Sequence, residues 1–166
     1  MKRTDREITS FEEIIKVAEK CDVIRVGFFD GEYPYIVPLS FGYAIKEGKA
    51  VFYFHGAKEG LKHDLLIKHN NVCVEGDIFY RYVNLKRSVT VEYQSFIAKG
   101  KASEITGQEA VFGIQCILNH CGYPRFSAKK CVALDITRVY KIEVESITGK
   151  QNLLPPVAPA AQNPAP

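Results

Sequence analysis

The segment richest in possible chemistry is His55-Gly56-Ala57-Lys58-Glu59-Gly60-Leu61-Lys62, which joins a predicted strand to a predicted helix. Its glycines allow the backbone to approach a ligand, and the N–H groups that open a helix carry partial positive charge. Lys62 adds a full charge in the first turn, and His55 adds a hydrogen-bond donor. This combination suits a bound anion, especially a phosphate. The spacing is not that of the Walker motif, so a plain turn with a solvated lysine stays open as the alternative.

Other catalytic and metal-binding patterns fit less well. The serines lack a nucleophile-elbow context, no HExxH occurs, and Glu12-Glu13 is better explained by helix capping. His120-Cys121 follows Cys116 by four residues, but zinc sites use tighter ligand pairs in two clusters, so we expect no metal site. The five cysteines form no CxxC, and their odd number favours a reducing, cytoplasmic environment over a disulfide framework.

Length and composition indicate one folded domain. The chain has 166 residues, of which 46% are hydrophobic and 25% are charged, with a formal net charge of +3. Lysines and arginines are scattered among acids, which argues against nucleic-acid binding. No apolar run approaches the roughly 20 residues that span a bilayer, and no signal peptide is readable, so we expect no membrane association.

Hydrophobic periodicity predicts strands interspersed with three helices. The helices are expected at 10–20, at 61–69 and from 106 to just before Gly122, and the strands at 23–29, 35–43, 50–55, 72–77, 88–100 and 132–144. Short turns favour antiparallel pairing, and a closed or nearly closed barrel would remove exposed edges. Pro38 lacks an N–H, so its strand should be an edge or carry a bulge. Residues 153–166 are rich in Pro and Ala and predict an extended tail.

Three segments together resemble the pyridoxamine 5′-phosphate oxidase-like FMN-binding split-barrel superfamily, within it the branch of nitroimidazole-resistance flavoproteins. These segments are Asp5–Ile8, Pro34–Tyr43 and Phe52–Lys62. The C-terminal stretch Val139–Lys150 is similar to the same branch. The resemblance covers about Lys2 to Lys150, and the combination is more specific than any one segment.

The resemblance implies a six-stranded antiparallel split barrel with about three flanking helices over residues 1–152, a homodimer, and FMN between the subunits. It places the flavin ring against the backbone of the strand from Tyr35 to Phe41. It puts the phosphate and the ribityl chain near Phe54, His55 and Lys62. It also implies that Ser95, together with Gln94, is a polar residue of the flavin site in the strand before Gly100, and that His55 is a functional, catalytic histidine. The cofactor-binding residues carried over are Tyr35, Ile36, Val37, Pro38, Leu39, Ser40, Phe41, Phe54, His55, Lys62, Gln94 and Ser95.

Two departures from the family pattern narrow the expected activity. Pyridoxamine-phosphate oxidases carry substrate-binding arginines and a C-terminal segment with Trp, whereas this chain has no Trp and a Pro/Ala-rich end. This argues against oxidation of vitamin B6. Leu61 stands where many relatives have an arginine, which removes one positive contact to a flavin phosphate.

The leading hypothesis is therefore an FMN-dependent oxidoreductase that passes electrons to a small acceptor such as a nitro compound. The flavin would perform the redox chemistry and the protein would position it. A second hypothesis is a flavin-binding module without turnover. A third is a haem or deazaflavin on the same scaffold. The substrate, the electron donor and the role of the tail stay open.

Overall fold

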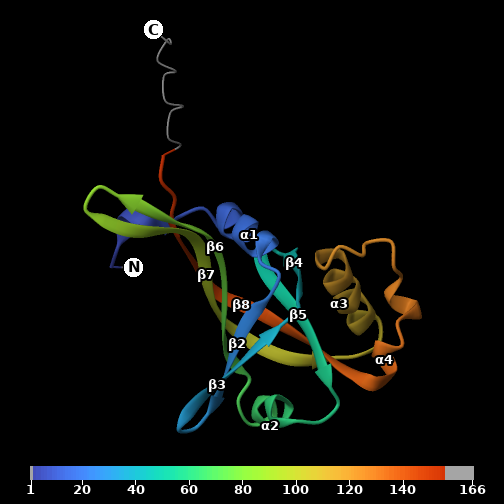
Figure 1. Cartoon of the computed structure of the whole chain (residues 1–166). Coiled ribbons are helices and arrows are strands. Elements are labelled where there is room, and N and C mark those ends of the chain that lie inside the picture. Colours follow the sequence, from blue (N-terminus) through green and yellow to red (C-terminus); the bar gives the residue numbers. More distant parts are fainter. Residues whose placement is uncertain (1, 156–166) are drawn as a thin grey trace.

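A computed structural model describes residues 2–155 of the chain. In order, its elements are a 3-10 helix at Thr4–Arg6, β1 (Glu7–Ile8), α1 (Phe11–Lys20), β2 (Ile24–Asp30), β3 (Tyr33–Leu39), β4 (Gly42–Lys46), β5 (Lys49–Ala57), α2 (Leu61–Lys68), β6 (Asn71–Leu85), β7 (Ser88–Ile105), α3 (Gly107–His120), a 3-10 helix at Ala128–Lys130, α4 (Ala133–Ile136) and β8 (Thr137–Asn152). Figure 1 shows these elements along the chain.

The strands form one antiparallel sheet in the order β3-β2-β6-β7-β8-β5-β4, with β1 paired to β8. The path ends at β3 on one side and β4 on the other, so the barrel is not closed by hydrogen bonds. Pro38 therefore lies in an edge strand, as predicted, where its missing N–H interrupts no second ladder.

Capping residues and a glycine mark the ends of the helices. Ser10 caps α1, because its hydroxyl accepts a hydrogen bond from the backbone N–H of Glu13 at 3.3 Å. The apolar face of α1 then buries Ile14, Val17 and Ala18 against the sheet. Gly122 follows α3 with φ +88°, a conformation that suits glycine at a helix end.

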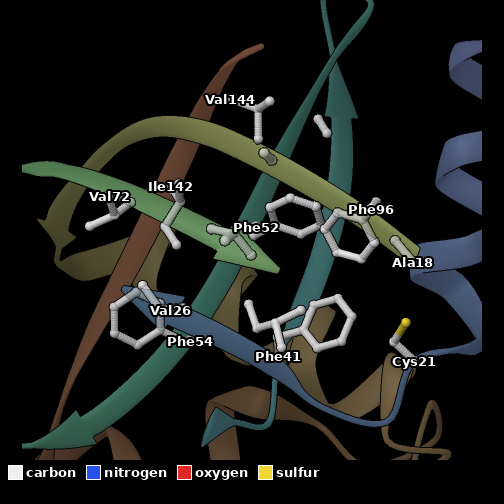
Figure 2. Close-up of a cluster of buried hydrophobic side chains, with 14 of the residues drawn as sticks. Ala18, Cys21, Val26, Phe41, Phe52, Phe54, Val72, Phe96, Ile142 and Val144 are labelled. Atoms are coloured by element: carbon white, nitrogen blue, oxygen red, sulfur yellow. The ribbon is translucent and has the colours of Figure 1, made fainter. Parts of the chain in front are cut away.

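The main core lies inside the curved sheet. Aromatic rings from neighbouring strands fill it: Phe52 stacks on Phe96 at 5.7 Å between ring centroids, and Phe41 meets Phe52 edge-on at 5.8 Å. Figure 2 shows these side chains pointing toward one another, with Ala18 and Cys21 approaching from the side of α1. Such aromatic packing accounts for much of the apolar area that the fold buries.

A second, smaller core lies on the other side of β5. Val51 and Tyr53 of β5 pack there against Ile114 and Ile117 of α3. Because successive residues of a strand point to opposite faces, Phe52 and Phe54 face the barrel while Val51 and Tyr53 face α3. The strand is thus buried on both faces until it reaches His55.

The predicted fold class is confirmed, with differences in detail. The sheet has eight strands where six were expected, because the predicted return strand 35–43 divides into β3 and β4 and the two-residue β1 adds to the sheet. The predicted strand over 132–144 is wrong in its first part. There the chain forms α4, and β8 begins at Thr137 and extends to Asn152.

β8 ends at Asn152. Just beyond it, the backbone N–H of Leu154 donates a 3.0 Å hydrogen bond to Oε1 of Glu92. The rest of the predicted tail, residues 156–166, lies outside the described residues. Within residues 2–155, no helix is both long and apolar enough to cross a membrane.

Candidate functional site

The candidate site lies where β5 ends and α2 begins. Gly60 precedes the helix with φ +131°, a conformation that a residue with a side chain rarely adopts. The first intrahelical hydrogen bonds run from the N–H groups of His63 and Asp64 to the carbonyl of Gly60. The N–H groups of Leu61 and Lys62 therefore stand before the bonded part of the helix and point out of its end. Figure 1 shows α2 directly after β5, at the opposite end of the barrel from α1.

Lys62 folds back over the end of β5. A Cβ built at Gly56 would lie 2.4 Å from Cε and 2.5 Å from Nζ of Lys62, so the ammonium occupies the space that a side chain at Gly56 would fill. Lys62 is half-buried there. Among the side chains that the structure describes, no carboxylate lies within ion-pair distance of it. Its charge is therefore available to an external anion.

His55 is the neighbour of Gly56 and points to the opposite face of β5. Its imidazole is half-buried. Burial lowers the pKa of His55, and the positive charge of Lys62 lowers that pKa further. The ring is consequently neutral at pH 7, with one nitrogen able to donate and the other able to accept a hydrogen bond.

Arg138 of β8 holds the connection between β5 and α2 in place. Its Nε donates a 2.6 Å hydrogen bond to the carbonyl of Lys58, and Nη1 contacts both carboxylate oxygens of Glu104 at 2.7 and 2.8 Å. On the helix itself, a 2.9 Å hydrogen bond joins Nδ1 of His63 to the hydroxyl of Tyr140. These contacts fix the strand end, the loop and the first turn relative to one another.

The residues expected from β3 and the following loop reach this region in part. β4 pairs Gly42 with Tyr53, and the ring of Phe41 just before it meets the ring of Phe52 of β5 at 5.8 Å, whereas Ser40 is exposed. Phe41 and Phe54 are both fully buried, and Phe54 stacks on Tyr140 at 4.9 Å, so only their main chains could touch a ligand. Tyr35, Val37 and Leu39 pack partly against the core, whereas Ile36 and Pro38 are exposed on the other face of β3.

Gln94 and Ser95 lie far from His55 in the same chain. β8 pairs its residue Val139 with His55 and its residue Gln151 with Gln94. Those two positions on β8 are 12 residues apart, which corresponds to roughly 40 Å along an extended strand. The amide of Gln94 accepts a 2.6 Å hydrogen bond from Tyr80 and donates one of 3.0 Å to Gln151. One copy of the chain does not bring the two groups together.

A hollow of about 590 Å³ lies on the outer face of the sheet and contains none of the predicted site residues. Its floor is the row Gly27, Cys73 and Lys99, which are register partners on β2, β6 and β7. His69, just after α2, stands at its rim. The sequence offered one signal for this hollow, a glycine within a strand, which often marks close approach of a ligand or another backbone.

The profile of the family described as pyridoxamine 5′-phosphate oxidase matches residues 10–151, most of the chain. The chain belongs to this family. The match spans α1 through β8 and includes the whole strand-to-helix junction around Lys62. No curated protein sequence matches the chain.

Solved structures with the same fold include a flavocytochrome and an FAD-binding protein. A Bacteroides thetaiotaomicron protein described as involved in 5-nitroimidazole antibiotic resistance has a TM-score of 0.75 and 28% identity, covering 87% of this chain and 86% of its own. The flavocytochrome Anf3 of Azotobacter vinelandii has a TM-score of 0.73 and 16% identity, covering 95% and 74%. An FAD- and haem-binding protein of Mycobacterium smegmatis has a TM-score of 0.73 and 15% identity, covering 97% and 94%. The last two, at this identity, share the fold alone.

Proposed function

We propose that this member of the pyridoxamine 5′-phosphate oxidase family binds FMN between two copies of the chain and passes electrons to a small acceptor, such as a nitro compound. The observation that carries the proposal is the Lys62 ammonium, which is held over the end of β5 without a described carboxylate partner, on a residue of the turn whose free N–H groups open α2. A phosphate matches both the positive charge and the donors.

The charges around the junction support an anion site of modest strength. Lys58 and Glu59 oppose each other in sign, and Asp64 in the first turn of α2 offsets part of the helix dipole. The site therefore depends on the placement of Lys62 and the N–H groups rather than on net charge. The missing arginine at Leu61 fits a site that uses one lysine where relatives use two cations.

Each residue of the site has a distinct part in the proposal. FMN, when bound, would supply the electron transfer that no side chain provides. Lys62 would neutralise phosphate charge, and the main chain from Val37 to Phe41 would border the ring. His55 would hydrogen-bond to the ring or the substrate, because its lowered pKa leaves the imidazole uncharged at pH 7.

The described hydrogen-bonding pattern supports two copies at each site. The residues that pair with Gln94 and Ser95 on β8 lie 12 and 11 residues from Val139, the residue that pairs with His55. A flavin that touches both groups would take Lys62 and His55 from one copy and Ser95 from the other. The similarity to the 5-nitroimidazole resistance protein favours a nitro compound as the acceptor.

Titration with related flavins tests the proposal. FMN added to cofactor-free protein should lose its fluorescence on binding, and Lys62→Ala should weaken that binding about tenfold or more, since a charge-assisted hydrogen bond contributes roughly 1.5–3 kcal/mol. Riboflavin, which lacks the phosphate, should bind both proteins equally. Lys68→Ala, at the other end of α2, is the matched control and should bind FMN as the wild type does.

Other cofactors and the question of turnover need separate measurements. Tighter binding of FAD than of FMN would identify FAD as the cofactor, and a Soret band on adding haem would identify haem. Oxidation of NADPH in the presence of a nitroaromatic acceptor separates an oxidoreductase from a binding module. A protein that takes up no flavin refutes the proposal.

A further inference from the structure

The end of β5 contains a glycine whose backbone does not require one. Gly56 is paired in register with Arg138 of β8 as an ordinary strand residue, and unlike Gly60 it does not have a positive φ. What distinguishes Gly56 is its surroundings. Of the atoms that its Cβ would meet within 4 Å, the three nearest all belong to the side chain of Lys62.

We propose that the missing side chain at Gly56 is what places the Lys62 ammonium at the end of β5, which makes Gly56 a positioning residue for the bound anion. This inference rests on the proposed function, with the phosphate of FMN as that anion. A methyl group at position 56 would overlap Cε and Nζ of Lys62, so the ammonium would have to move away from the strand. The backbone and the neighbouring side chains would not have to move.

The nature of the overlap makes the substitution informative. Lys62 is long and flexible, so its end can shift at little cost, and Ala at an ordinary strand position restricts the unfolded chain more than Gly does. Gly56→Ala should therefore leave the stability of the fold unchanged while it displaces one charge. Gly27→Ala is the matched control, because a Cβ there meets its nearest atom, the Cys73 carbonyl oxygen, at an ordinary 3.6 Å.

Binding of flavins gives the first readout. Gly56→Ala should weaken FMN binding roughly threefold to tenfold, as expected when a charge-assisted contact is displaced rather than deleted. It should leave riboflavin binding unchanged. In a Lys62→Ala background, Gly56→Ala should have no further effect on FMN, because the two substitutions remove the same interaction. Additive effects, or an equal loss of riboflavin binding, would overturn the inference.

Titration of His55 gives a second readout that needs no cofactor. The ammonium of Lys62 contributes to the lowered pKa of His55, so moving it away should raise that pKa. Other charged or titratable groups at this end of the molecule include Lys58, Glu59, His63, Asp64 and the Arg138–Glu104 pair, and none of them is substituted in the variant. Proton NMR should show the His55 pKa rising in Gly56→Ala and Lys62→Ala, with Gly27→Ala unchanged.

The two readouts separate failure of this inference from failure of the proposed function. If the wild-type protein binds no FMN, the proposed function falls, and the His55 titration alone decides the role of Gly56. If the protein binds FMN and Gly56→Ala alters neither the FMN affinity nor the His55 pKa, the inference falls while the proposed function stands. Urea unfolding of each variant confirms that the fold is intact.

Discussion

His55 is placed where its protonation affects both the site and the fold. Burial is the larger cause of its lowered pKa and the charge of Lys62 is the smaller. The imidazole therefore binds a proton more weakly in the folded protein than in the unfolded chain. In the unfolded chain the pKa of the histidine is about 6.5. Below that pH the unfolded state binds a proton that the folded state resists.

This difference predicts a loss of stability in mild acid. Between the folded and unfolded pKa of His55 the unfolded chain holds more protons, so the free energy of unfolding falls as pH decreases through that window. His55→Gln should abolish this part of the pH dependence. The free energy of unfolding of the wild type should therefore increase relative to that of the variant as pH rises from about 5 to about 8. Urea unfolding of cofactor-free protein at several pH values measures the difference. Parallel curves for the two proteins would contradict the prediction.

The residue types around Lys62 mark the junction between strand and helix as a candidate site. They do not predict which side chains there are accessible. Glycines, a lysine and a histidine between a strand and a helix suit an anion site, although a plain turn with a solvated lysine has the same residues. Phe41 and Phe54 lie in apolar runs, and nothing in such a run tells a buried ring from one that touches a ligand. The hollow above Gly27 was not predicted, because its floor comes from three strands distant in sequence.

At the scale of elements, the position of α3 depends on a close approach to β4. A Cβ at Gly42 would lie 2.2 Å from the carbonyl carbon of Cys116 and 2.3 Å from the backbone nitrogen of Ile117. Helix and strand are therefore in backbone contact, and no side-chain rotation could relieve an added methyl group. This contact sets the second core, where α3 covers Val51 and Tyr53 of β5.

Gly42→Ala should consequently destabilise the protein by roughly 1–3 kcal/mol, because overpacking against backbone forces the helix to shift. Chemical denaturation gives the free energy of unfolding directly. The matched control is Gly27→Ala, which adds the same methyl group to another strand without such a contact and should change stability by less than about 1 kcal/mol. Equal stability of the two variants would show that α3 can move freely on β4.

The elements that the sequence predicted well are those with a regular apolar period and clear ends. The helix capped by Ser10 is one, and β5 with its run into Gly56 is another. The long strands β6 and β7 were predicted only in part. In β6 the residues Phe79–Tyr82 are all exposed, so the alternation that identifies a strand is lost there, whereas β7 was predicted over 88–100 and only its last residues, 101–105, were missed.

At the scale of the whole molecule, the separation of two residue groups determines how a site could be built. Figure 1 shows the hairpin end of β6 and β7 on the far side of the barrel from α2. Ser95, in the middle part of β7, pairs with Lys150, whereas Lys62 lies in the first turn of α2 and His55 near the end of β5. If both groups bind one flavin, a dimer with twofold symmetry would have two equivalent sites, each with Lys62 from one copy and Ser95 from the other.

A heterodimer of two variants tests this arrangement. If the chains carrying Lys62→Ala and Ser95→Ala are joined, one site would combine both substitutions, and the other would take intact Lys62 and intact Ser95 from opposite copies. Differently tagged chains, co-expressed and purified through both tags, should therefore bind FMN at wild-type affinity in about half of their sites, although each homodimer binds weakly. If each site instead came from a single chain, every site would carry one substitution, and none would reach wild-type affinity. A monomer in solution would exclude the shared site before any titration.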